Sequence, residues 1–347
     1  MDRTKISLRI AILLLAAGAH TGCRQILTGE EIANTPVHNF EKLYDDFNAY
    51  YGLFEVKQVN WDSLYNEYHP QVTDQTTDEE LYDLMVAMLA PLKDNHITLF
   101  PTNPSLPRWS NDLEEDGAYE IANYDFEVVK ENYLTSYTEL KPSFGYGMLG
   151  PDIGYVYIQN FSTDGGPAKK DIEKMLAALK DTKGLVLDIR ANSGGFDPLA
   201  QYIAGRFADS RRLYMTYRKR NGPDRSDFTA PVEWYVEPTG DFQYTKPVVL
   251  LTTRATASAA ETFTLAMREL PNVTQVGDTS SGAFSDAIMR ELYNGWMFTL
   301  SIGDYRAANG QSYEGIGLTP DILVQNKNED IIAGKDEALE KAIEILQ

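Results

Sequence analysis

Apolar residues recur at spacings of three and four through residues 38–99, which is the pattern of helices that bury one face. Two apolar stripes are rich in aromatic residues, and a third helix is predicted over residues 77–92. Thr77 is placed to cap that helix, and Glu80 completes a capping box. The stripes consist of Phe40, Leu43, Tyr44, Phe47 and Tyr51 and of Trp61, Leu64, Tyr65 and Tyr68. We expect them to form the core of a small helical N-terminal region rather than a cofactor site.

From residue 151 to residue 347, short apolar runs alternate with amphipathic stretches. Strands are expected at 153–158, 185–189, 213–218, 248–252, 273–276, 296–301 and 322–324, and helices at 167–179, 198–207, 257–269 and 336–346. This alternation predicts an α/β fold in which helices cover a sheet rich in parallel strands. Prolines and an acidic run interrupt residues 100–150, and we expect a linker there.

Ser258 stands at the junction between a predicted strand and a predicted helix. Residues 248–253 are apolar and rich in β-branched residues, whereas residues 256–263 are typical of the first turns of a helix. N–H groups at a helix start lack partners inside the helix and favour negative charge, so the position suits a nucleophile. It equally suits a serine that caps the helix, and the local pattern leaves both interpretations open.

The chain begins with a predicted targeting segment. Arg3, Lys5 and Arg9 precede an apolar run over residues 10–18, which is too short to span a bilayer. A positively charged start followed by such a run predicts export from the cytoplasm.

Cys23, the only cysteine, follows the apolar run closely. This arrangement resembles the cleavage site of a bacterial lipoprotein, with residues 1–22 as signal peptide and residues 23–37 as a tether. His20 departs from the lipoprotein pattern, so the alternative is an ordinary secretory signal cut nearby. Lipidation of Cys23 would make the protein a lipoprotein of the cell envelope, facing the periplasm or held in the outer membrane.

The charge of the chain narrows the range of partners. It has 31 basic and 51 acidic side chains and a formal net charge of −20, which argues against nucleic acid and anionic membrane surfaces. After the predicted signal peptide, the histidines are His38, His69 and His96, too far apart in sequence for a typical histidine metal site. We therefore expect no metal and no other cofactor.

Four segments in a fixed order resemble the serine peptidases of family S41. They are DIRANSGG at residues 188–195, TASAAE at 256–261, VGDTSSGAFS at 276–285 and EGIGLTPDI at 314–322. The resemblance implies the spiral ββα core shared with ClpP and the crotonases, a nucleophile at the serine of TASAAE, and a peptide or unfolded protein as substrate. Many members carry a PDZ domain, but the segment before the predicted core is too short for one, and we expect none.

The resemblance also bears on the general base that must activate a serine hydroxyl. The processing proteases of the family place a lysine in the glycine-containing turn after the helix. This chain has Ala283 there, and no lysine occurs in residues 247–326. The tricorn-like branch uses a histidine instead, and His96 matches it. Glu314 matches the glutamate of that branch and is expected to orient the imidazole, while Asp94 is expected to shape the loop.

Hydrolysis also needs N–H donors for the oxyanion of the tetrahedral intermediate. The N–H of Ala259 follows the serine at the helix start. The resemblance implies a second donor at Gly194 or Gly195, with Gly194 preferred. Together these residues predict an exported serine endopeptidase or carboxyl-terminal processing peptidase that forms an acyl-enzyme on Ser258.

Two other classes of function share the fold. A noncatalytic peptide- or ligand-binding lipoprotein is the main alternative, because the S41 fold also occurs in retinoid-binding relatives. Crotonase-type acyl-CoA chemistry uses a similar oxyanion hole without a serine, but the predicted export disfavours it, since coenzyme A is cytoplasmic. Only an activated serine would react with a fluorophosphonate.

Overall fold

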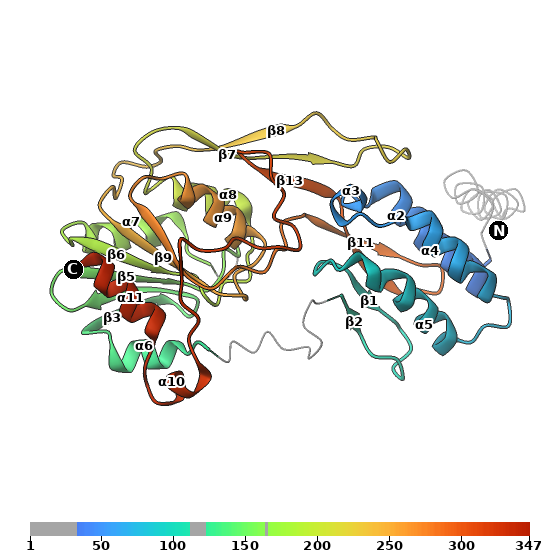
Figure 1. The fold of residues 1–347 in the computed structure, drawn as a ribbon, viewed down its shortest axis with the longest axis horizontal. Coiled ribbons are helices and arrows are strands. Elements are labelled where there is room, and N and C mark those ends of the chain that lie inside the picture. The colour runs from blue at the N-terminus through green and yellow to red at the C-terminus, as the bar shows by residue number, and fades with distance from the viewer. Residues whose placement is uncertain (1–32, 112–122, 164–165) are drawn as a thin grey trace, which may run out of the picture.

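The computed structural model describes residues 33–111, 123–163 and 166–347. Figure 1 shows a helical lobe near the N-terminal end of the described chain and an α/β lobe that carries the C-terminus, with long strands running between them. Within these described ranges, no helix is both long enough and apolar enough to cross a membrane. The predicted signal peptide and Cys23 lie outside the described residues.

The helical lobe forms as its apolar stripes predict. Thr35 Oγ1 accepts a hydrogen bond from the N–H of His38 at 3.2 Å, which caps the first helix. Thr77 and Glu80 form the predicted capping box, with hydrogen bonds of 3.3 and 2.9 Å. The elements of the lobe are α2 (Pro36–Tyr50), α3 (Phe54–Lys57), α4 (Trp61–Tyr68), η1 (His69–Gln71), α5 (Asp78–Leu89) and η2 (Ala90–Leu92). Phe40, Phe47, Tyr51 and Trp61 are buried together, and the partly buried Tyr44, Tyr65 and Tyr68 pack against them, which confirms the predicted core.

A four-stranded antiparallel sheet in the order β11-β12-β1-β2 packs beneath these helices. Its strands are β1 (Thr98–Phe100), β2 (Trp109–Ser110), β11 (Ala287–Glu291) and β12 (Met297–Ser301). The prediction that residues 296–301 belong with the α/β half is therefore wrong. Phe298 and Leu300 are fully buried against the core of the helical lobe, and Phe298 pairs with Leu99 of β1. Strands β11 and β12, which come late in the chain, thus complete the helical lobe.

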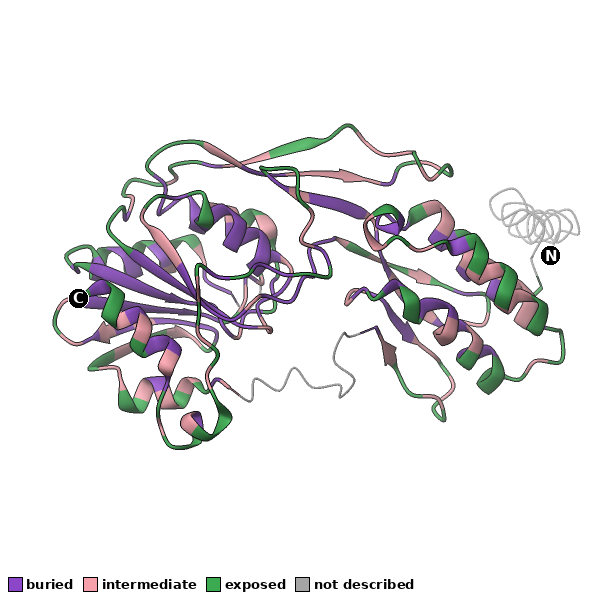
Figure 2. Ribbon diagram, in the orientation of Figure 1, coloured by how far each residue is buried: buried purple, intermediate pink, exposed green. Residues whose placement is uncertain are grey.

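The α/β lobe is built on a seven-stranded sheet in the order β14-β10-β9-β6-β5-β4-β3, with its first five strands parallel. Alternate residues of β6 point to opposite faces. Leu185 and Leu187 pack with the core that holds α7, α8 and α9, whereas Val186 packs with the core that holds α6 and α11. Helices therefore cover both faces of the sheet, as the alternating pattern predicts (Figure 2).

The elements of this lobe extend over most of the described residues after 123. The strands are β3 (Ser136–Lys141), β4 (Phe144–Leu149), β5 (Ile153–Ile158), β6 (Gly184–Asp188), β9 (Val248–Thr252), β10 (Val273–Gly277) and β14 (Ile322–Leu323). The helices are α6 (Phe126–Asn132), α7 (Lys169–Leu179), α8 (Asp197–Ala204), α9 (Ala259–Arg268), α10 (Asn328–Ile332) and α11 (Glu337–Leu346).

The predicted linker over residues 100–150 is wrong for its second half. Helix α6 and strands β3 and β4 belong to the α/β lobe, and β4 pairs antiparallel with β5 along its whole length. On its other edge β4 pairs with β3, and Gly145 and Gly147 allow that close approach, because a Cβ on either residue would lie 2.1 Å from an atom of β3. The two glycines interrupt the apolar alternation by which a strand is recognised.

A third sheet, in the order β13-β7-β8, reaches from the α/β lobe toward the helical lobe (Figure 1). Its strands are β7 (Arg212–Lys219), β8 (Val232–Val236) and β13 (Gly303–Ala307). Beyond β7, Arg220 donates to the carbonyl oxygens of Asn48 and Ala49, each at 3.0 Å. These hydrogen bonds fasten the ribbon to the end of α2 and join the two lobes.

Candidate active site

Ser258 lies between β9 and α9, at the junction that the sequence predicts. Its backbone adopts φ +55° and ψ −124°, which is rare for a residue with a side chain and costs about 1–3 kcal/mol. Its N–H donates to the carbonyl of Ala283 at 3.0 Å. The hydroxyl makes no capping hydrogen bond with described residues. A serine kept in a strained conformation without a capping bond is typical of functional sites.

Gly194 lies directly against this serine. A Cβ on Gly194 would sit 2.7 Å from Cβ of Ser258 and 2.9 Å from N of Ala259, and its φ is +103°. Both the contact and the backbone conformation therefore require glycine. The Gly194 N–H donates to Asn192 Oδ1 at 2.9 Å.

Two backbone N–H groups close to Ser258 in the described chain are uncommitted. The N–H groups of Ala259 and Gly195 have no hydrogen-bond acceptor among the described residues. Gly195 is exposed and has φ +140°. Of the two glycines, Gly195 therefore has the uncommitted donor, and Gly194 makes the close approach possible.

Glu261, in the first turn of α9, anchors the loop that follows β10. Its fully buried carboxylate accepts hydrogen bonds from the Ser280 hydroxyl at 2.6 Å and from the N–H groups of Gly282 and Ala283, both at 2.7 Å. The N–H of Ser258 also points to it at 3.2 Å. Burial raises the pKa of Glu261 to about 7, while these donors pull in the opposite direction. The sequence signal for this contact is an acid three residues after a serine at a helix start, the spacing of Ser258 and Glu261.

His96 follows a tight turn in which Lys93 has φ +46°. The His96 N–H donates to Asp94 Oδ1 at 2.9 Å, and Nδ1 of its ring lies 4.0 Å from the same oxygen. Asp94 is fully buried, whereas the His96 side chain is 20% exposed. The Thr299 hydroxyl donates to the His96 carbonyl at 2.6 Å, which ties the turn to β12.

This histidine turn packs against the loop beside Ser258. Asn95 Nδ2 donates to Ser281 Oγ at 3.1 Å, and the N–H of Ser281 donates to the carbonyl of Thr256 at 2.9 Å. Figure 1 shows the turn between α5 and β1 reaching toward the α/β lobe. The fold thus brings residues 94–96 to the loop that adjoins Ser258, although no hydrogen bond joins the Ser258 hydroxyl to the His96 ring in the described chain.

Glu314 belongs to the same cluster but contacts other groups. Its buried carboxylate accepts the N–H of Phe284 at 2.8 Å through Oε2, and Oε1 lies 3.1 Å from Nζ of Lys57. Burial raises the pKa of Glu314, the charge of Asp94 raises it further, and Lys57 and His96 oppose both effects. Of the two acids, Asp94 is the one paired with the His96 ring within 4.0 Å. The sequence indicated Glu314 but gave no sign of Lys57.

An apolar pocket of about 350 Å³ opens next to Gly195. Phe196, the residue after Gly195, lines it and is 50% exposed despite its large apolar ring. The other lining residues are Ser162, Thr163, Pro167, Lys169, Pro198, Leu199 and Tyr202. Within the described part of the chain, no three His, Cys, Asp or Glu side chains converge as the ligands of a metal ion would.

Comparisons with known proteins give one consistent result. Residues 152–324 match the model of peptidase family S41, and residues 33–90 match that of the tricorn protease C1 domain. The crystal structure of a putative peptidase from Parabacteroides merdae ATCC 43184 superposes with a TM-score of 0.80 and 33% identity, over 90% of this chain and 97% of that one.

Two curated relatives carry more specific names. A carboxy-terminal-processing protease of Bartonella bacilliformis is 31% identical over 196 residues, which are 54% of this chain and 43% of that protein. The tricorn protease of Thermoplasma volcanium is 26% identical over 215 residues, which are 61% of this chain and 19% of that protein. The chain spans less than half of the length of the curated processing proteases that it matches.

Proposed function

The chain belongs to peptidase family S41, and from that membership we propose that it hydrolyses peptide bonds through an acyl-enzyme on Ser258. The observation that carries the proposal is the strained Ser258 backbone, flanked by the uncommitted N–H groups of Ala259 and Gly195. A serine hydroxyl with uncommitted backbone donors nearby is the arrangement that acyl transfer requires.

His96 is the proposed general base. It would take the proton of the Ser258 hydroxyl as the oxygen attacks the substrate carbonyl, and would then pass it to the leaving amine. The N–H groups of Ala259 and Gly195 would bind the oxyanion of the tetrahedral intermediate. A water molecule activated by the same imidazole would release the acyl group and restore the serine.

The identity of residue 283 supports a histidine base. Ala283 is 3% exposed and carries no amine, and the chain has no lysine between residues 247 and 326. His96 is carried by a turn that packs on the loop of Ala283 through the hydrogen bond between Asn95 and Ser281.

Two buried carboxylates are candidates for orienting the His96 ring. Asp94 Oδ1 lies 4.0 Å from Nδ1, so a small rotation of the ring would complete a hydrogen bond. Glu314 lies farther from the ring and is held by Lys57 and Phe284. We propose that Asp94 orients the ring and that Glu314 stabilises the imidazolium with its charge.

The substrate is proposed to be a peptide or an unfolded protein. The names of the relatives support this class, and the apolar pocket beside Phe196 supports a substrate with an apolar side chain next to the scissile bond. The proposed location is the cell envelope, with a lipid on Cys23, which rests on the sequence of residues 1–23.

Labelling with a fluorophosphonate tests the proposal directly. The purified protein should form a covalent adduct that peptide mass analysis maps to Ser258, and it should cleave an unstructured peptide. A protein that neither labels nor cleaves would instead be a binding protein with the S41 fold, and the proposal would be wrong.

A further inference from the structure

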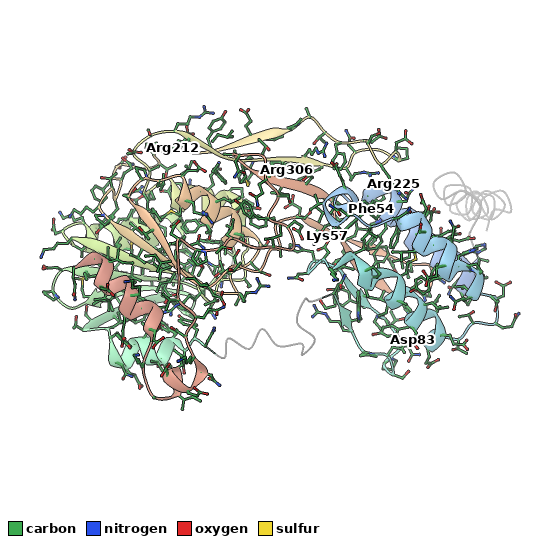
Figure 3. The ribbon with its side chains drawn as sticks, in the orientation of Figure 1. Phe54, Lys57, Asp83, Arg212, Arg225 and Arg306 are labelled. Atoms are coloured by element: carbon green, nitrogen blue, oxygen red, sulfur yellow. The ribbon has the colours of Figure 1, made fainter. Side chains whose placement is uncertain are left out.

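Lys57, the last residue of α3, carries a buried ammonium at the edge of the proposed active site. Its side chain is only 7% exposed, and Nζ lies 3.1 Å from Oε1 of Glu314. The same Nζ donates a hydrogen bond to the carbonyl of Lys93 at 2.8 Å. Figure 3 shows Lys57 where the helical lobe faces the α/β lobe. One ammonium therefore joins three segments: α3, the turn that leads to His96, and the loop of Glu314.

The loop of Glu314 fits closely around this ammonium. Gly315 has φ +75°, and a Cβ on it would lie 3.0 Å from Nζ of Lys57. A side chain at this position would be strained by its backbone conformation and would press on the ammonium. Glycine at position 315 therefore leaves room for the ammonium, and the Lys57 side chain is only 7% exposed.

The charges of the cluster explain why a cation is needed there. Asp94 and Glu314 are both buried, and two carboxylates taken out of water repel each other. With the Lys57 ammonium, the three groups carry a net charge of −1. A proton that arrives on His96 brings the net charge of the four groups to zero, which is the charge state that the imidazolium step of acyl transfer creates.

We propose that Lys57 is a positioning residue for the serine chemistry. Its ammonium holds the Glu314 carboxylate in its charged form beside the turn that carries His96, so that the helical lobe completes the active site. This inference rests on the proposed function and deepens it. Lys57 does not touch the reacting atoms, so its effect is exerted through Glu314 and through the carbonyl of Lys93.

Other titratable groups face the pair from each neighbouring segment. Tyr51 faces it from the end of α2, and burial together with Asp94 and Glu314 raises the pKa of Tyr51 well above its usual value. Lys57 and Glu314 both line a cavity of about 460 Å³, whose other charged lining residues are Glu55, Lys93 and Arg306. Glu55 pairs with Arg218 at 3.3 Å and Arg306 pairs with Asp304 at 3.0 Å. Neither neutralises Glu314.

Replacing Lys57 by methionine tests the inference, because methionine is also unbranched but uncharged. Without the ammonium, the cluster holds more protons at a given pH, on Glu314 or on His96. The active form, with both groups deprotonated, then appears only at higher pH. The rise of kcat/KM with pH should move up by about half a unit or more. At neutral pH, a shift of half a unit should lower kcat by at most about threefold, with little change in KM because Lys57 does not bind substrate.

Two further variants separate charge from packing. Lys57→Arg keeps the charge and should return the pH profile to the wild-type position. Lys42→Met removes a lysine of the same lobe that pairs with Asp46 at 2.9 Å in α2, and it should leave the profile unchanged. If Lys57→Met folds poorly, the double variant Lys57→Met/Glu314→Gln leaves neither member of the pair charged. It should fold, with lower activity and a profile at the wild-type position.

A profile of Lys57→Met that superposes on that of the wild type would overturn the inference, even if activity or stability were lower. Lys57 would then only support the packing of the loop. A double variant whose profile stayed displaced would overturn it as well. A wild-type protein that no fluorophosphonate labels would instead disprove the proposed function, so the two failures are distinguishable.

Discussion

The backbone of Ala283 holds the backbone of Ser258. The Ser258 N–H donates to the Ala283 carbonyl at 3.0 Å, and the Ala283 N–H in turn donates to Glu261 Oε2 at 2.7 Å. Residue 283 is where the resemblance to the processing proteases would place a lysine. Here the backbone of that residue holds Ser258, the proposed nucleophile, while its side chain is a buried methyl group. The proposed general base, His96, is accordingly carried by another segment.

The strain at Ser258 predicts an unusual effect on stability. Ser258→Gly should abolish labelling and raise the free energy of unfolding by about 1 kcal/mol, because glycine adopts φ +55° without steric cost. Ser258→Ala should also abolish labelling but leave that free energy nearly unchanged, since alanine keeps the strain. Urea unfolding of the three proteins measures the difference. Equal stability of the glycine and alanine variants would mean that no strain is stored at this position.

The assignment of His96 predicts a large loss of rate. His96→Ala should lower kcat/KM by about 10³-fold or more, because a nucleophile and its base act as a unit. His69→Ala is the control, since His69 pairs with Glu41 in the helical lobe at 3.3 Å. Asp94→Asn should cost more than Glu314→Gln if Asp94 orients the ring. Near-native kcat/KM in His96→Ala would show that another group activates Ser258.

Whether a contact can be predicted from the sequence depends on how far apart along the chain its residues lie. The junction at Ser258 was predictable because strand, turn and helix are adjacent in sequence and each has a local pattern. The pairing of Lys57 with Glu314 was not, because it depends on tertiary packing between segments at opposite ends of the described chain. For the same reason, the alternating pattern of residues 296–301 indicated a strand but could not indicate which sheet the strand joins.

The pocket beside Gly195 predicts a preference among substrates. Phe196→Ala should lower kcat/KM about tenfold for peptides with leucine next to the scissile bond, and less for peptides with alanine there. Phe242→Ala is the matched control, because Phe242 is 41% exposed and does not line the pocket. An equal change for both peptides would mean that the pocket does not bind the substrate side chain.

The proposed lipidation of Cys23 predicts where the protein is found in the cell. In a bacterial host that processes lipoproteins, the wild type should fractionate with membranes, and Cys23→Ser should move to the soluble periplasmic fraction. Metabolic labelling with a fatty-acid analogue should mark only the wild type. A wild-type protein that is already soluble would support simple secretion.

The buried carboxylate of Glu261 predicts how stability depends on pH. Its pKa in the folded protein is about 7, above the ordinary value of 4.5, so the folded state binds this proton more tightly than the unfolded chain does. The stability that Glu261 contributes is therefore full below pH 4.5 and is lost as the pH rises through about 7. Glu261→Gln removes this titration but keeps the size of the side chain. The difference in the free energy of unfolding between wild type and Glu261→Gln should shift in favour of the wild type by roughly 2–3 kcal/mol between about pH 8 and about pH 5.

Comparing the two proteins at each pH removes the effect of the other carboxylates, and exposed Glu291→Gln serves as the control for a glutamate in water. Protonation also weakens the acceptor that holds the N–H groups of Ala283 and Ser258, so labelling of Ser258 should slow over the same range in which stability rises. The difference in the free energy of unfolding between wild type and Glu261→Gln could instead stay constant with pH. That result would mean that the hydrogen bonds from Ser280, Gly282 and Ala283 outweigh burial and keep Glu261 ionised throughout.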